Sequence, residues 1–149
     1  MRTILILAGR YLPGYKDGGP VRTIENLTNI FGKQYDIRIM CKDRDHGDLH
    51  QYSNILVNTY NKVGKFKCRM ILKEIKKVDL IYCCGPYNSY AIKTMVLKKL
   101  NLFPQPLVIA SMGSFSRGAL SIKSKKKTVF LYLMKKFGFF NEIVWSVTS

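Results

Sequence analysis

Two glycines between an apolar run and a helix are the residues of this sequence best suited to bind a ligand. Residues 3–8 are apolar, Gly18 and Gly19 end the polar loop that follows, and helical periodicity begins at Val21. Without Cβ atoms the backbone can turn sharply and lie close to a ligand. The N–H groups and positive dipole end of the helix favour an anion such as phosphate. The pattern indicates a phosphate-binding loop; a long surface turn before a helix is the alternative.

Metal and disulfide chemistry find little support in the sequence. The four cysteines (Cys41, Cys68, Cys83 and Cys84) form no C-x-x-C pair, and the two histidines lie elsewhere, at His46 and His50. Zinc-ligand spacing is therefore absent, and we expect no metal. Three of the cysteines end apolar runs, where a small buried thiol fits, so we interpret all four as reduced.

The elements that must position the glycines alternate between strand and helix. Apolar runs predict strands over 3–8, 35–41, 79–84, 106–111 and 143–148, with a weak one over 55–58. Helices are predicted over 21–32, 66–77, 89–100 and 119–137. This alternation predicts an α/β domain of three layers with a mostly parallel sheet. Ligands of such sheets bind at the carboxyl ends of the strands, where the loops 9–20, 42–48, 85–88 and 112–118 must meet.

Length and composition predict one globular domain over residues 1–149. Hydrophobic residues make up 47%, which argues against disorder. No apolar run reaches the roughly 18 residues that cross a bilayer, and the first run is too short for a signal-peptide core. We therefore expect a cytoplasmic protein or one bound peripherally to the cytoplasmic face of a membrane. The net charge of +16 indicates an anionic partner, such as nucleic acid, acidic lipid or nucleotide-sugar phosphate.

The basic residues gather most densely in the last predicted helix. Lysines flank its apolar segment 129–134 on both sides, at Lys123, Lys125, Lys126, Lys127, Lys135 and Lys136. A basic helix with exposed aromatic residues can lie on an anionic leaflet. Two alternatives remain: a core helix with a lysine-rich outer turn, or an apolar face that meets another domain.

Three separated motifs, in order, resemble one enzyme family. They are the run 11–27 (YLPGYKDGGPVRTIENL), the loop 43–48 (DRDHGD) and the stretch 112–126 (MGSFSRGALSIKSKK), which is followed by Trp-x-x-Thr-Ser at 145–149. Together they resemble the N-terminal, acceptor-side domain of family 4 glycosyltransferases, which have the two-domain GT-B architecture. The likeness extends over nearly the whole chain.

This resemblance implies a reaction and its substrates. Family members transfer a sugar from a nucleotide-sugar donor to an acceptor with retention of configuration, and they need no cofactor or metal. The acceptor is usually a bacterial polysaccharide or glycolipid, often linked to lipid. The glycine-rich loop lies near the donor diphosphate, which assigns Gly18 and Gly19 to the phosphate and makes Arg22 a helper in the first helical turn.

The chain also departs from the family. The second Rossmann-like domain, with its paired-glutamate motif for nucleotide and sugar, would follow Ser149, so we expect this chain alone to be inactive or nearly so. Ser111-Met112-Gly113 stands where relatives often have Pro-Arg-Gly, which removes a cation expected near the cleft. His46 and His50 match no catalytic position, and the catalytic residue stays unassigned.

Candidates for binding the sugar acceptor follow the predicted strands. Asp43, Arg44 and Asp45 lie in a loop with three carboxylates, and a carboxylate suits sugar hydroxyls because it accepts two hydrogen bonds. The alternative is a turn whose acids pair with its own arginine. Weaker candidates at neighbouring strand ends are Asn88, Ser114 and Arg117.

Three functions from different classes compete. The first is the acceptor-side domain of a glycosyltransferase, which partners a C-terminal donor domain. The second is a stand-alone, non-catalytic module that binds a nucleotide or sugar phosphate, or a truncated relic of such an enzyme. The third, a nucleic-acid binder, lacks a recognition-helix motif and interleaved aromatic and basic residues, so we expect no nucleic-acid partner. We favour the first.

Overall fold

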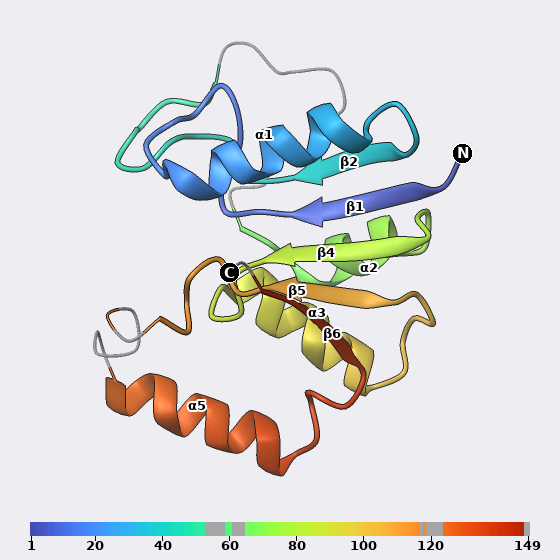
Figure 1. Cartoon of the computed structure of the whole chain (residues 1–149), viewed down its shortest axis with the longest axis vertical. Coiled ribbons are helices and arrows are strands. Elements are labelled where there is room, and N and C mark those ends of the chain that lie inside the picture. Colours follow the sequence, from blue (N-terminus) through green and yellow to red (C-terminus); the bar gives the residue numbers. More distant parts are fainter. Residues whose placement is uncertain (53–58, 61–64, 117, 119–123, 148–149) are drawn as a thin grey trace.

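The computed structural model of this chain describes residues 1–52, 59–60, 65–116, 118 and 124–147 (Figure 1). Its strands are β1 (Thr3–Leu7), β2 (Asp36–Met40), β3 (Thr59–Tyr60), β4 (Leu80–Cys84), β5 (Leu107–Ala110) and β6 (Ile143–Ser146). Its helices are α1 (Gly19–Phe31), α2 (Cys68–Ile75), α3 (Ser89–Lys99) and α5 (Ser124–Lys136). Every long predicted element is present. The weak strand predicted over 55–58 lies outside the described residues, as do residues 119–123 of the last predicted helix.

The six strands form one sheet in the order β3-β2-β1-β4-β5-β6, and every neighbouring pair is parallel. At the centre, Leu5 of β1 is paired with Arg38 of β2 on one side and with Ile81 of β4 on the other. This order is that of a Rossmann-like sheet: β2 and β3 lie on one side of β1, and β4, β5 and β6 lie on the other. The predicted α/β fold with a parallel sheet is confirmed.

The two faces of the sheet carry separate cores because successive strand residues point to opposite sides. On one face, Ile6 and Ile39 pack with Val21 and Ile24 of α1. On the other face lie the buried side chains of α2 and α3, which pack against Leu5, Leu7, Ile81, Cys83, Leu107 and Ile109. Figure 1 shows α1 on the opposite side of the sheet from α2 and α3. Both faces of β1 are apolar, which explains its uninterrupted hydrophobic run.

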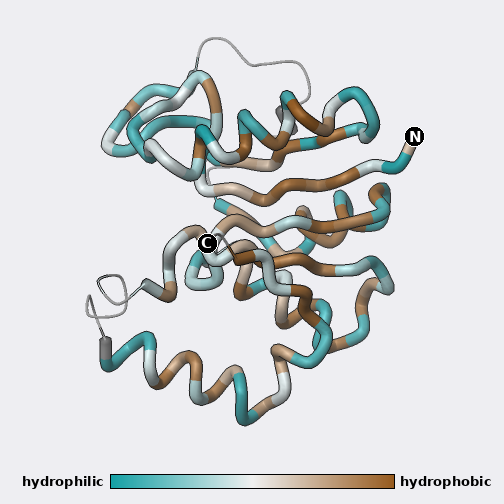
Figure 2. Tube along the Cα trace, viewed as in Figure 1, coloured by the Kyte–Doolittle hydropathy of each residue, from teal (hydrophilic) through white to brown (hydrophobic). Residues whose placement is uncertain are grey.

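Helix α5 lies at the end of the molecule that is furthest from α1 (Figure 1). Met134 anchors it in the second core, with Phe130 packed alongside. A chain of edge-to-face aromatic contacts continues from there: Phe130 with Tyr87, Tyr87 with Phe115, Phe115 with Trp145 and Trp145 with Phe140, with ring centroids 5.3–6.2 Å apart. In Figure 2 hydrophilic and hydrophobic residues alternate along α5, whereas the central strands are mostly hydrophobic.

Candidate functional site

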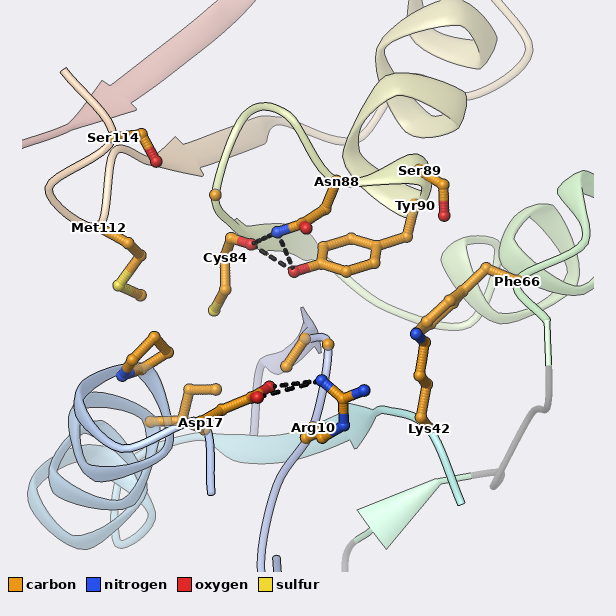
Figure 3. Close-up of a pocket in the computed structure, with 15 residues that line it drawn as sticks. Arg10, Asp17, Lys42, Phe66, Cys84, Asn88, Ser89, Tyr90, Met112 and Ser114 are labelled. Atoms are coloured by element: carbon orange, nitrogen blue, oxygen red, sulfur yellow. Dashed lines mark hydrogen bonds and ion pairs between the residues drawn. The ribbon is translucent and has the colours of Figure 1, made fainter. Parts of the chain in front are cut away.

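A cavity of about 310 Å³ opens at the carboxyl ends of the central strands. The loop after β1 leads to α1 on one face and the loop after β4 leads to α3 on the other, so the chain diverges at this point and leaves a crevice. Its polar lining comes from all four loops that the sequence singles out, as Figure 3 shows for Arg10, Asp17, Lys42, Asn88, Ser89 and Ser114. The predicted convergence of these loops is therefore confirmed.

One wall of the cavity holds an ion pair. Both carboxylate oxygens of Asp17 accept hydrogen bonds from Nη1 of Arg10, at 3.0 Å each (Figure 3). The Arg10 side chain is 16% exposed and that of Asp17 is 29% exposed, so solvent screens the pair only in part. The Nε of Arg10 is buried and has no partner among the described residues. With Lys42 nearby in the lining, the wall carries two cations against one carboxylate, an arrangement that suits an anion.

The opposite wall is fixed by hydrogen bonds at the end of β4. The Cys84 carbonyl accepts from Asn88 Nδ2 at 2.9 Å and from the Tyr90 hydroxyl, and Asn88 Nδ2 also lies 2.9 Å from Tyr90 Oη (Figure 3). Gly85 makes this turn possible: its φ is +85°, and a Cβ there would lie 2.7 Å from Asn88 Nδ2. The amide nitrogen of Asn88 is thus engaged, while its Oδ1 has no hydrogen-bond partner in the described part of the chain.

The ionisable groups of this wall are neutral. Burial raises the pKa of Tyr90, and burial raises that of the Cys84 thiol to about 12. Neither group therefore supplies a charge or a nucleophile near neutral pH. Next to them, Met112 has a φ of +46°, which is uncommon outside glycine, and it too lines the cavity. Such strained residues cluster at ligand-binding sites, which supports the cavity as the functional one.

The predicted phosphate-binding glycines lie at the edge of this cavity. Gly18 caps α1 with a φ of +61°, no side chain caps the helix, and Pro20 in the first turn lines the cavity. A Cβ on Gly19 would meet nothing within 4 Å, so packing does not require glycine there. Arg22 is exposed and does not line the cavity. The structure thus places the helix N-terminus beside the cavity but not the arginine expected to help it.

The predicted acceptor-binding residues of the β2 loop are engaged elsewhere. Asp43 is buried and accepts hydrogen bonds from Arg44 Nε at 2.9 Å and from Gln51 Nε2 at 2.8 Å. The Arg44 hydrogen bonds lower the pKa of Asp43, so its carboxylate stays charged. Asp43, Arg44 and Asp45 do not line the cavity. For Asp43 and Arg44 the geometry favours the alternative of a self-paired turn.

Asp45 instead fastens the β2 loop to the glycine-rich loop. Its carboxylate accepts from the backbone N–H groups of Tyr15 at 2.9 Å, Lys16 at 3.1 Å and His46 at 2.8 Å. Burial alone would raise the pKa of Asp45, but these three hydrogen bonds bring it below its usual value. The ammonium of Lys16 also pairs with Asp48. Asp45 therefore holds the loop that carries Asp17 and Gly18.

Of the weaker candidates, Asn88 and Ser114 do line the cavity, while Arg117 lies outside the described residues. Sequence reasoning missed Arg10, Asp17 and Lys42. A signal was present, because Arg10 and Lys42 are the first cations after two strands that pair side by side, with Leu7 opposite Met40. These two cations stand in the crevice even though Met112 occupies the position where an arginine was expected.

The six lysines predicted to face a membrane differ in their surroundings. Lys125, Lys126, Lys135 and Lys136 are exposed on α5. The Lys127 ammonium lies over the Tyr87 ring, 5.2 Å from its centroid, and Lys123 is outside the described residues.

Within the described residues, no helix is long and apolar enough to span a bilayer, and no three His, Cys, Asp or Glu side chains gather to hold a metal.

All four cysteines are free thiols; Cys41, Cys83 and Cys84 are buried and Cys68 is exposed.

The chain matches no known protein-family model, and it has no significant match among curated proteins or solved structures.

Proposed function

We propose that this domain is the acceptor-side half of a retaining glycosyltransferase, and that its cavity binds the phosphate-bearing end of a nucleotide-sugar donor. The observation that carries the proposal is the placement of Arg10, Lys42 and the uncapped N-terminus of α1 around one crevice at the strand ends. Each of these groups favours a negative charge, and a diphosphate presents several anionic oxygens to them.

The size of the cavity supports a partial donor site. About 310 Å³ is near the lower limit of the 300–1,000 Å³ typical of ligand sites. That volume suits a sugar phosphate better than an entire nucleotide sugar, so the nucleoside would be bound by a second domain. Asn88 Oδ1 and the hydroxyls of Ser89 and Ser114 are then available to bind sugar hydroxyls.

One observation favours the alternative of a non-catalytic binding module for a nucleotide or sugar phosphate. The only carboxylate among the cavity-lining residues is Asp17, which is bound by Arg10, and the Cys84 thiol is neutral. The described part of the cavity therefore offers no free general base. Under the first proposal, any such group would come from the partner domain or the substrate.

The test is a calorimetric titration of the chain with inorganic phosphate, a sugar 1-phosphate, uridine diphosphate and a nucleotide sugar. We expect anion binding that Arg10→Gln and Lys42→Gln each weaken at least tenfold, since a charge-assisted hydrogen bond contributes roughly 1.5–3 kcal/mol. Lys33→Gln, on the exposed turn before β2, is the matched control and should bind like the wild type.

The outcomes separate the two functions. Weak donor binding that increases when a C-terminal donor domain is added supports the glycosyltransferase half, whereas tight binding by the chain alone supports the stand-alone module. Both functions are wrong if no phosphate compound binds at millimolar concentration, or if the Arg10 and Lys42 variants bind as well as the Lys33 variant.

A further inference from the structure

The outward face of α5 carries apolar side chains that the rest of the described chain does not cover. Val129 is 57% exposed, Tyr132 63% and Leu133 42%, and Phe137, directly after the helix, is 59% exposed. The opposite face of the helix supplies its core contacts through Met134 and Phe130. A surface helix whose two faces are both apolar has more hydrophobic area than its own fold buries.

Lysines flank this apolar patch at both ends. Lys125 and Lys126 lie in the first turn of α5, and Lys135 and Lys136 lie in its last turn, all exposed. Lys136 lies eleven positions after Lys125, a rise of roughly 16 Å along the helix. Lys125, Val129, Tyr132 and Lys136 follow at intervals of three or four residues and thus share one side of the helix. The helix contains no acidic residue.

An apolar groove of about 630 Å³ extends this surface along the flank of α5. Tyr132 and Leu131 line it from the helix, and Phe140 and Trp145 line it from the segment that follows. Trp145 is the only tryptophan of the chain. Tyr132 belongs to both the outward face and the groove, and Lys127 and Lys135 contribute to the groove lining.

We propose that α5 docks on an anionic lipid bilayer, with its axis parallel to the membrane plane. The four exposed lysines would bind lipid phosphates, while Val129, Tyr132, Leu133 and Phe137 enter the boundary between headgroups and acyl chains. Lysine and apolar side chains alternate along this face, so the lysine stems must lie along apolar surface while their ammonium groups stay at the headgroup level. Long lysine side chains can do this. An acidic protein partner fits less well, because lysine is depleted at the centre of protein interfaces.

This inference does not depend on what the cavity binds. The first experiment is co-sedimentation of the full chain with phosphatidylcholine vesicles, with or without phosphatidylglycerol, over a range of salt concentrations. We expect binding only to the anionic vesicles, weakening as salt rises. Replacing Lys125, Lys126, Lys135 and Lys136 by glutamine should reduce the partition coefficient by up to several hundred-fold, since each basic group near the surface contributes about fivefold.

The matched control removes the same charge elsewhere. Lysine-to-glutamine substitution at Lys33, Lys67, Lys73 and Lys76 changes four exposed lysines outside α5 and should retain most of the binding. The proposal is wrong if the chain fails to bind anionic vesicles at low salt, if neutral vesicles bind equally, or if the two quadruple variants lose binding to the same extent.

Trp145 provides a second measurement that needs no substitution. Because it lines the groove beside α5, brominated lipids should quench its fluorescence on binding, and its emission should shift to the blue. Tyr132→Ser with Leu133→Ser should reduce both effects, whereas Ile30→Ser with Leu100→Ser, two exposed apolar residues elsewhere, should not. Vesicle binding without quenching of Trp145 would contradict the proposed orientation.

Discussion

Asp17 holds the guanidinium that an anionic ligand would need. Its two oxygens each lie 3.0 Å from Nη1 of Arg10, and the pair stands in the cavity wall (Figure 3). An anion bound to the same guanidinium would have its charge on the order of 5 Å from the carboxylate. The repulsion between two unit charges at that distance is about 3 kcal/mol at an effective dielectric constant of about 20. Asp17→Asn removes this repulsion and leaves the size of the side chain unchanged.

The expected gain is smaller than the full repulsion because the Asp17 side chain is 29% exposed. After screening, about 1–2 kcal/mol remains, so Asp17→Asn should bind inorganic phosphate roughly 5- to 30-fold more tightly than the wild type. The same substitution weakens a partly buried ion pair, so the free energy of unfolding should fall by about 1 kcal/mol. The first quantity is measured by calorimetric titration and the second by urea unfolding.

The control for this experiment is Asp48→Asn. Asp48 also pairs with a cation of the glycine-rich loop, Lys16, but it lies outside the cavity. Both variants lose one negative charge, so a general electrostatic effect on anion binding would appear in both. The reasoning is refuted if Asp17→Asn binds phosphate no more tightly than the wild type, or if Asp48→Asn gains as much.

Three further substitutions test the surroundings of the cavity. Gly19→Ala should change the free energy of unfolding by less than about 0.5 kcal/mol yet weaken anion binding. Gly18→Ala, at a φ of +61°, should lower the free energy of unfolding measured in urea by about 1–2 kcal/mol. Equal losses of stability in the two variants would contradict this expectation. Because the pKa of Asp45 is lowered in the folded state, its carboxylate stabilises the fold above about pH 4, and this stabilisation is lost as the pH falls. The free energy of unfolding of Asp45→Asn should therefore be about 1–3 kcal/mol lower at neutral pH, with a flatter acid-unfolding profile. Tyr87→Phe removes a buried hydroxyl that has no partner among the described residues, and its thermal unfolding midpoint should stay the same or rise.

The strands of this fold could be predicted from the sequence because each central strand is buried on both faces. Both Leu5 and Ile6 are buried, one in each core, so β1 reads as a continuous apolar run. The position of the cavity followed from the same pattern, since parallel strands bring their carboxyl ends together. The two-residue strand β3 could not be found, because two residues are too few to show a period.

Side-chain partners could not be predicted, because they depend on how loops meet. Asp43 and Asp45 look alike in the sequence, yet Asp43 binds an arginine side chain and Asp45 binds three backbone N–H groups. The exposed position of Arg22, outside the cavity lining, has a visible cause. Val21 and Ile24 face the core, and since each helical residue turns by about 100°, the next position after Val21 points away from the sheet.

The cavity joins two parts of the chain that also meet through the pairing of β1 with β4 and through the two cores. Arg10 and Lys42 belong to the half built from β1, α1 and β2, while Asn88 and Ser114 belong to the half built from β4, α3 and β5. A ligand that contacts both halves would act as a non-covalent cross-link. This link would be lost in any state in which either half has unfolded locally. At a hundred times its dissociation constant it would stabilise the closed chain by about 2.7 kcal/mol. Amide hydrogen exchange should then slow in both halves together, even at amides far from the ligand.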